Sequence, residues 1–362
     1  MSTRSFADGV FTAADLRSAM NAGLLHLGAS PTASQVQPAS LDLTLGDAAW
    51  RVRAAFLPGA KRTVEERLAD GLALHRLDLR DGAVLEKGCV YLVRLRESLA
   101  LSPDLLARAN PKSSTGRIDV FVRLVTDRGV AYDSVPAGYK GPLYAEISPR
   151  TFSILVCEGS SLNQLRLRKG HAVLSDDDLR ARQSRGELVS GKGWSIGGGL
   201  CLSVDLGDSF GPVVGYRARR HSALIDVDRI AGLNPDDYWE PIPRPASGFM
   251  ILDPDEFYIL ASQEELKIPS DLAAEMLPID TDLGAFRVHY AGFFDPGFGV
   301  EQGSRAVLEI RGYDAPFVLE HGQTVARLVY EQLTGPPDVG YGAGLASNYQ
   351  GQGLRLSKHF RM

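Results

Sequence analysis

Short runs of Val, Ile, Leu, Phe and Tyr recur along the chain, and each run is bounded by Gly, Pro or Asp. Short apolar runs with these boundaries are typical of β-strands, and many of them at close spacing favour a β-barrel or a β-sandwich. We predict strands at residues 89–96, 119–125, 152–157, 286–290, 306–310 and 324–330.

Helix and loop account for the remaining segments of the pattern. We expect helix only in short pieces, near residues 13–22 and 176–184 and at the turns that contain Pro103 and Pro269. The glycine-rich stretch 190–199 and the proline-rich stretch 241–245 are predicted to be loops, because Gly and Pro interrupt regular structure. The fold class predicted from the pattern is therefore dominated by β-structure, with a few short helices.

An internal repeat divides the chain into two halves. Residues 91–111 match residues 258–278 without a gap at a spacing of 167, and residues 145–147 match residues 308–310 at a spacing of 163. Residues 11–16 and 174–179 are also 163 apart, and in both copies a Gly follows seven residues after the Leu. We predict one domain over residues 1–172 and a second, similar domain over residues 173–362.

The composition is that of an ordinary globular protein that buries a sizeable core. The 362 residues are 44% hydrophobic and 23% charged, which agrees with two domains. No apolar run approaches the roughly 20 residues that span a bilayer, and the first residues lack the apolar core of a secretory signal. The net charge of −5 does not indicate a nucleic-acid partner. We therefore expect a protein without nucleic-acid or membrane partners.

Three cysteines, Cys89, Cys157 and Cys201, are too few and too widely spaced for a metal site of the usual kind. An odd number of cysteines favours reduced thiols in a cytoplasmic protein. We expect all three to be core residues.

Candidate chemistry first appears in the first copy of the repeat, at residues 111–117. Small hydroxyl residues and a Gly expose donors, and Lys112 and Arg117 supply positive charge, which together suit phosphate oxygens. The segment alone would also be explained by a surface turn. At the matching positions the second copy has Asp280 and Asp282, whose carboxylates would repel a phosphate.

The second copy carries a different motif that the first copy lacks. Asp295, Pro296 and Gly297 form a favourable turn sequence, and Glu309 follows on a predicted strand. The first copy keeps Glu146 at the matching position but has no aspartate in its turn, so we expect Glu146 to be structural. Because each copy has lost the motif of the other, the sequence predicts one composite site rather than two independent ones.

Five motifs in series resemble those of dCTP deaminase, a family of the dUTPase-like β-barrel superfamily, over nearly the whole chain. They lie at residues 37–46, 112–117, 290–299, 308–310 and 349–352. The length resembles a tandem form with two dUTPase-like barrels, each a distorted jelly roll. The resemblance implies hydrolytic deamination of dCTP to dUTP and ammonia, which supplies dUTP for dUMP and thymidylate synthesis.

The resemblance also implies roles for individual residues. Glu309 matches the family's acid/base, which activates water against C4 of cytosine; without the resemblance it would be explained equally well as a solvated strand residue. Ser113 and Arg117 match residues that orient the water and bind substrate, and Ala291 matches the position whose backbone helps to hold the water. These four are the expected catalytic residues. The expected substrate-binding residues are Lys112, Ser114, Gly116, Asp295, Tyr349 and Gln352.

A carboxylate at residue 309 suits the chemistry of deamination. Water must lose a proton as it attacks C4, N3 must gain one, and the departing amine must be protonated, so one well-placed group can serve all three steps. The zinc-dependent alternative needs a His-x-Glu and a Pro-Cys-x-x-Cys sequence, and neither occurs here. We expect no protein-bound metal and no zinc, and we expect Mg²⁺ to accompany the triphosphate.

Residues 341–358 are too rich in Gly for a stable helix or strand. The segment resembles the family's mobile tail, which folds over the bound nucleotide and would exclude bulk water. The family often has a lysine just before the tyrosine, where this chain has Asn348. Phosphate contact from the tail would then depend on Arg355 or Lys358.

Three functions remain open at this stage. The first is a deaminase that stops at dUTP. The second is a bifunctional deaminase and pyrophosphatase, or a dUTPase, which needs a further carboxylate such as Asp295 or Asp119 to activate water at the α-phosphate. The third is a nucleotide-binding regulatory module without catalysis. In the family, sites form between neighbouring barrels of a trimer, so a homo-oligomer is also possible.

Overall fold

The computed structural model describes residues 6–28, 32–191, 193–278, 286–288, 292–312, 314–338 and 351–361, and these are mostly β-structure. The chain forms two compact units. Unit 1 comprises Met1–Ala172, Ala223–Ile230 and Leu333–Asp338, and unit 2 comprises Val173–Ser222, Ala231–Gln332 and Val339–Met362. The boundary after Ala172 coincides with the repeat, whereas the two short segments of unit 1 that come from the second half were not expected from the sequence.

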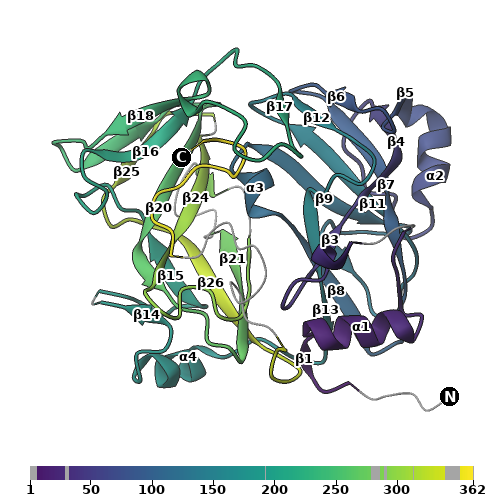
Figure 1. Ribbon diagram of the computed structural model, residues 1–362, viewed down its shortest axis with the longest axis horizontal. Coiled ribbons are helices and arrows are strands. Elements are labelled where there is room, and N and C mark those ends of the chain that lie inside the picture. The colour runs from purple at the N-terminus through teal and green to yellow at the C-terminus, as the bar shows by residue number, and fades with distance from the viewer. Residues whose placement is uncertain are drawn as a thin grey trace. The chain divides into compact units, whose positions relative to one another are not determined.

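The strands of unit 1 form three sheets (Figure 1). One has the order β1-β13-β8-β10 with β3 paired to β13, the second β5-β4-β7-β11-β9 with β2 paired to β7, and the third β17-β12-β6. Its strands are β1 (Gly9–Val10), β2 (Leu25–His26), β3 (Leu41–Leu43), β4 (Leu45–Val52), β5 (Ala73–Asp78), β6 (Ala83–Leu85), β7 (Val90–Ala100), β8 (Leu105–Pro111), β9 (Val120–Thr126), β10 (Ser134–Val135), β11 (Lys140–Pro149), β12 (Ile154–Val156), β13 (Asn163–Lys169) and β17 (Ile225–Asp226). Its helices are α1 (Ala13–Asn21), α2 (Val64–Arg67) and α3 (Ser113–Gly116), with a 3₁₀ turn at Ala33–Gln35 and a π turn at Leu68–Leu72.

Unit 2 repeats this plan. Its sheets have the orders β18-β16-β20-β24-β22, with β14 paired to β20, then β15-β26-β21-β23 and β19-β25. Its strands are β14 (Val189–Ser190), β15 (Leu200–Ser203), β16 (Val213–Ala218), β18 (Trp239–Pro243), β19 (Phe249–Leu252), β20 (Phe257–Leu266), β21 (Leu272–Pro278), β22 (Phe286–Val288), β23 (Phe293–Phe294), β24 (Ser304–Gly312), β25 (Phe317–Glu320) and β26 (Thr324–Gln332). Helix α4 (Asp176–Gln183) and a 3₁₀ turn at Pro235–Asp237 complete it.

Strand pairing in the two units keeps the spacings found in the sequence. Glu146 of β11 lies opposite Leu92 of β7, and Glu309 of β24 lies opposite Ile259 of β20. The two glutamates are 163 residues apart and their partners 167 apart. A residue of one unit can therefore be matched to its counterpart in the other by register rather than by sequence alone.

Local hydrogen bonds repeat in the same way. Helices α1 and α4 begin with the same capping box, in which Thr12 and Ser175 cap and an aspartate three residues later bonds back. Buried Glu97 accepts hydrogen bonds from the backbone and hydroxyl of Thr44, and Glu264 accepts the equivalent pair from Ser203. Each unit thus satisfies its helix start and its buried carboxylate with donors from the same part of the fold.

The core of unit 2 lies between its two large sheets. One apolar cluster joins Leu200 and Leu202 of β15 to Leu260 of β20, and it includes Leu308 and Ile310 of β24. Successive side chains of a strand point to opposite faces. Val307 and Glu309 therefore lie on the face of β24 that is turned away from this cluster.

Five of the six predicted strand segments are confirmed, and the sixth, 286–290, is confirmed at residues 286–288, since 289 and 290 lie outside the described residues. The two predicted α-helices are also confirmed, as is the loop at residues 191 and 193–199, whereas Ser190 belongs to β14. Three expectations are wrong. Pro103 and Pro269 lie in turns without helix, because strands β8 and β21 begin directly after them. Residues 241–243 belong to β18, an edge strand that tolerates Pro because its outer side needs no donor. The three cysteines are free but only half-buried, since they lie at strand ends or on an outward position of β15.

In the part of the chain that the structure describes, no helix has both the length and the apolar character needed to cross a membrane.

Candidate active site

In unit 1 the candidate segment forms a single helical turn between two strands. Lys112 follows β8, α3 covers Ser113–Gly116, and Arg117 ends the turn. The backbone N–H groups of Thr115 and Gly116 bond to the carbonyl of Lys112, and that of Arg117 bonds to the carbonyl of Ser113. These three N–H groups are used within the turn. Ser113 is half-buried, whereas Ser114, Gly116 and Arg117 are buried.

Lys112 is held by a neighbouring carboxylate. Its ammonium group forms an ion pair with Asp42, and it lies 3.4 Å from the Ser161 hydroxyl oxygen. Asp42 belongs to the first of the five motifs, residues 37–46, so the ion pair joins two motifs of the sequence within unit 1. The charge that Lys112 offers to an anion is correspondingly reduced.

In unit 2 Glu309 lies in the middle of β24, with β20 on one side and β22 on the other. Glu309 is only 4% exposed, and a carboxylate is rarely buried so deeply unless it is paired. It lies on the face of the sheet opposite the apolar cluster. A buried carboxylate on a rigid central strand is well placed for proton transfer, because the strand fixes its position.

The turn at Asp295 is tied to the segment between β20 and β21. Its carbonyl accepts a hydrogen bond from Phe298, and the N–H of Gly297 donates to the carbonyl of Ile268 at 2.9 Å. Gly299 has φ +70°, and a Cβ there would lie 2.1 Å from the Leu266 carbonyl oxygen, so only Gly fits. The turn sequence predicted from Asp-Pro-Gly is confirmed, and Asp295 itself is buried.

The C-terminal segment contacts β24 at one end. Gln352 is buried; its side chain donates to the carbonyl of Arg305, and its own carbonyl accepts the N–H of Arg305. The N–H of Gly351 donates to the hydroxyl of Ser304 at 2.9 Å. Residues 351–361 form neither helix nor strand, which confirms the prediction for residues 341–358 in its described part, 351–358.

The same segment is anchored a second time near its end. Phe360 packs edge-on against Trp239 and Tyr238, with ring centroids 5.9 and 5.3 Å apart. The N–H groups of Gly232 and Leu233 donate to the carbonyl of His359. The sequence predicted a role for Gln352 but not for Arg305 or Phe360, because the contacts of these two residues join distant parts of the chain and belong to no motif.

Glu146, the counterpart of Glu309, is occupied by its own unit. One of its carboxylate oxygens accepts the N–H of Phe56 at 3.1 Å and the hydroxyl of Tyr132 at 3.2 Å. Phe56 and Tyr132 also pack against an apolar cluster that includes Leu92. Burial raises the pKa of Glu146, and the two hydrogen bonds and Arg123 only partly offset that effect. This arrangement agrees with a structural role for Glu146.

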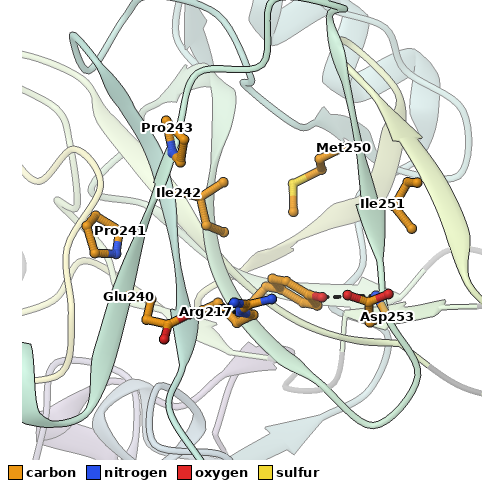
Figure 2. Close-up of a pocket in the computed structure, with 9 residues that line it drawn as sticks. Arg217, Glu240, Pro241, Ile242, Pro243, Met250, Ile251 and Asp253 are labelled. Atoms are coloured by element: carbon orange, nitrogen blue, oxygen red, sulfur yellow. Dashed lines mark hydrogen bonds and ion pairs between the residues drawn. The ribbon is translucent and has the colours of Figure 1, made fainter.

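A pocket of about 250 Å³ in unit 2 contains none of the predicted site residues (Figure 2). It lies between Pro241–Pro243 of β18 and Met250 and Ile251 of β19. Its charged lining includes the ion pair of Arg217 with Glu240. The pocket is therefore not the candidate active site.

Several predicted features fall outside the described residues. These are Ala291, Tyr349, Asn348, the aligned positions 280–284, residues 289–290 of a predicted strand and residues 341–350 of the predicted tail. Among the residues that the structure does describe, no group of three or more His, Cys, Asp or Glu side chains is arranged to hold a metal ion.

The chain is similar to known proteins along its whole length. Residues 7–171 match the family model of the 2′-deoxycytidine 5′-triphosphate deaminase (DCD) N-terminal domain, and residues 175–360 match that of the C-terminal domain. The crystal structure of 2′-deoxycytidine 5′-triphosphate deaminase from Agrobacterium tumefaciens superimposes with a TM-score of 0.87 and 50% identity, over 90% of this chain and 99% of that one.

Two further relatives are named "dCTP deaminase, dUMP-forming". The protein from Beutenbergia cavernae is 30% identical over 191 residues, which cover 50% of this chain and 90% of that protein. The protein from Methanobrevibacter smithii is 36% identical over 109 residues, which cover 29% of this chain and about half, 54%, of that protein.

Proposed function

Since this chain belongs to the family of 2′-deoxycytidine 5′-triphosphate (dCTP) deaminases, we propose that it is an enzyme that hydrolyses dCTP to dUTP and ammonia, with Glu309 as its acid/base. The observation that carries this proposal is the position of Glu309. It is a nearly fully buried carboxylate on a central strand, in the domain that matches the family's C-terminal model, and its side chain is not part of the apolar core.

The reaction places three demands on Glu309. Its carboxylate takes a proton from water as the water oxygen attacks C4, and it passes a proton to N3 of the ring. When the C4–N bond breaks, a second transfer delivers a proton to the amine, which leaves as ammonia. Water and dCTP are thereby converted to dUTP and ammonia with no net change in the enzyme. A positioned group of this kind typically contributes about 10²–10⁴ in rate.

Residues of both units serve this reaction in our proposal. Ser113 and Arg117 of unit 1 orient water and substrate, with Lys112, Ser114 and Gly116 in the same segment. Ala291, Asp295, Tyr349 and Gln352 of unit 2 complete the set. The support is the distribution of motifs: the segment of residues 111–117 occurs only in the first copy, and the Asp-Pro-Gly turn occurs only in the second.

We further propose that the chain arose by tandem duplication of a dUTPase-like barrel. The matched strand registers, the paired capping boxes and the paired buried glutamates Glu97 and Glu264 support this origin. The substrate would be the Mg²⁺ complex of dCTP, since triphosphates bind that ion. The free thiols of Cys89, Cys157 and Cys201 favour the cytoplasm as the place of action.

A second candidate is supported by the names of relatives that form dUMP. A dUMP-forming enzyme would also cleave the α–β phosphate bond and release pyrophosphate. The A. tumefaciens structure, which is more similar in identity and coverage, is titled only as a deaminase. We therefore propose dUTP as the product.

A product assay decides between the two candidates. The purified chain is incubated with dCTP and Mg²⁺, nucleotides are separated by chromatography, and ammonia and pyrophosphate are assayed in parallel. Ammonia and dUTP in equal amounts support the proposal. Release of dUMP and pyrophosphate would replace it with the bifunctional enzyme, and the absence of any product would reject both.

A further inference from the structure

Strand β25 of unit 2 has a counterpart whose outer edge is occupied. By register, β19 and β25 match β6 and β12 of unit 1: Leu252 lies opposite Phe317 as Leu85 lies opposite Ile154. In unit 1 a third strand, β17, pairs in parallel with the outer edge of β12. Among the described residues of unit 2, β19 and β25 form a sheet of two strands only.

The backbone groups of unit 1 that bind β17 have counterparts that can be identified in unit 2. The N–H of Ile225 donates to the carbonyl of Ser153 at 3.1 Å, and that of Val227 donates to the carbonyl of Leu155 at 3.2 Å. The counterparts of these acceptors, 163 residues later, are the carbonyls of Pro316 and Val318. His321 donates inward to Gly248, and because backbone direction alternates along a strand, Val318 directs its N–H and carbonyl outward.

At the C-terminal end of the edge, a side chain accepts the backbone N–H in the same way in both units. The N–H of Cys157 donates to the side chain of Ser160, and the N–H of Glu320 donates to the side chain of Gln323 at 3.1 Å. Cys157 and Glu320 are 163 residues apart, and so are Ser160 and Gln323. The edge of β25 therefore offers the same short set of backbone groups as β12: two carbonyls and the N–H between them.

The edge of β25 lacks the protection that a neighbouring edge has. Strand β18, the edge of the large sheet, carries Pro241 and Pro243, which cannot donate to an added strand. Strand β25 itself contains no Pro or Lys; Pro316, directly before it, lacks an N–H but keeps its carbonyl as an acceptor. The face of the ribbon beside this edge is apolar and open, with Ile251 52% and Val318 47% exposed. A two-stranded ribbon is marginally stable alone, so a third strand would stabilise it.

One position differs between the units and determines the chemistry of the occupant. In unit 1, Asp226 is the last residue of β17, and Asp228 follows it. Burial is the main cause of the raised pKa of the nearby Cys157 thiol, and the charges of Asp228 and Asp226 raise this pKa further. The counterpart of Cys157 is Glu320, which is exposed. Aspartates at the same places of an added strand would meet the Glu320 carboxylate and be repelled, whereas lysines or arginines would be attracted.

From this juxtaposition we propose that β25 is a docking edge for an extended segment of a partner protein, which adds in parallel and carries alternating apolar residues followed by basic ones. Its apolar residues occupy the places of Ile225 and Val227, and its basic residues face Glu320. Main-chain bonds to Pro316 and Val318 supply the affinity, as in other cases of strand addition. The acidic counterpart segment of a second copy of this chain is disfavoured by Glu320.

Two peptides test the proposal on the full chain. The first has the sequence of residues 222–229, and the second is the same peptide with Asp226→Lys and Asp228→Lys. We expect the basic peptide to bind at least tenfold more tightly by calorimetry, and Glu320→Lys to reverse the preference. Val318→Pro, which removes the outward N–H at an exposed edge position, should abolish binding of both peptides without changing the thermal unfolding temperature.

Equal binding of the two peptides, or binding that persists in Val318→Pro, would overturn the proposal. So would the absence of binding by both peptides at millimolar concentration. Sedimentation of the chain alone provides the remaining comparison. If the chain self-associates and Val318→Pro disrupts the assembly, the occupant is a second copy and not a partner protein.

Discussion

The backbone N–H of Phe56 donates to the carboxylate of Glu146 at 3.1 Å. Glu146 is the counterpart of Glu309 in the first copy of the repeat. Phe56 lies in the loop between β4 and β5, which belongs to unit 1. The corresponding loop of the second copy runs between β16 and β18, and part of it, Ala223–Ile230, belongs to unit 1 and not to unit 2. A loop of its own unit thus supplies a hydrogen bond to Glu146, as a structural role requires.

The first prediction follows from this difference. Glu309→Gln should lower kcat by about 10²–10⁴, because the amide cannot accept and return a proton, while the affinity for dCTP changes little. Glu146→Gln should leave both unchanged within about twofold, since an amide oxygen can still accept from Phe56 and Tyr132. Ammonia release and dCTP titration measure the two effects. Equal losses of activity in the two variants would reject a single catalytic carboxylate.

The second prediction concerns pH and stability. Because burial raises the pKa of Glu146 in the fold, ionisation of this group costs stability at pH values above its folded pKa. As the pH falls through the folded pKa toward the ordinary value of 4.5, that cost disappears. Glu146→Gln removes the cost at all pH values, so the variant should be at least as stable as the parent at neutral pH.

The pH dependence of the difference is the decisive observation. The free energies of unfolding of the two proteins should converge as the pH is lowered from 8 toward the ordinary carboxyl pKa of 4.5. Urea unfolding at a series of pH values measures them. A difference that widens in favour of the variant as the pH falls would contradict the raised pKa.

The third prediction concerns the turn at α3. Ser113→Ala removes a hydroxyl from a half-buried position, and it should raise KM and lower kcat together, by roughly tenfold for a lost hydrogen bond to a charged group. Arg117→Ala should do the same but also reduce stability, because its side chain is buried. Kinetics on dCTP, with unfolding curves as the control for folding, separate the two effects.

Lys112 requires a matched pair of variants. It is already paired with Asp42, so Lys112→Met leaves a buried carboxylate without its partner, while Asp42→Asn leaves the lysine charge free. If Lys112 binds phosphate, Asp42→Asn should lower KM and Lys112→Met should raise it. If the pair is purely structural, both variants should lose stability with KM unchanged.

The sequence predicted much of the fold because most strands are bounded by residues that interrupt β-structure. The spacings of 163 and 167 also predicted which strands correspond, and the pairing of Glu146 with Leu92 and of Glu309 with Ile259 keeps them. The ends of strands were harder to predict. Pro241 and Pro243 read as a loop, yet an edge strand accepts them because its outer N–H groups have no partner in the sheet.

The site was predictable where it depends on motifs and unpredictable where it depends on long-range contacts. Glu309, Asp295 and Gln352 were identified from local sequence, and all three are buried in unit 2. The contact of Gln352 with Arg305 joins residues 47 apart, and nothing in the sequence around Arg305 indicates it. The ion pair of Lys112 with Asp42 spans 70 residues and was likewise not foreseen.

The last prediction concerns the two anchors of the C-terminal segment. Phe360 is almost fully buried against Trp239 and Tyr238, and truncation of a buried Phe typically costs about 3–5 kcal/mol. Because Phe360 lies in a terminal segment, that cost should be paid by local release and not by global unfolding. Phe360→Ala should therefore leave the main thermal transition nearly unchanged and expose Arg355 and Lys358 to trypsin, with cleavage at least tenfold faster.

Gln352→Ala provides the matched comparison at the other anchor. It removes the side-chain hydrogen bond to the Arg305 carbonyl, worth about 1 kcal/mol, but keeps the backbone bond between the same residues. Trypsin cleavage should rise only a few-fold, while KM for dCTP rises more than in Phe360→Ala if Gln352 also contacts the nucleotide. The same KM in both variants would mean that Gln352 acts only as an anchor, because its effect would then follow from release of the segment alone.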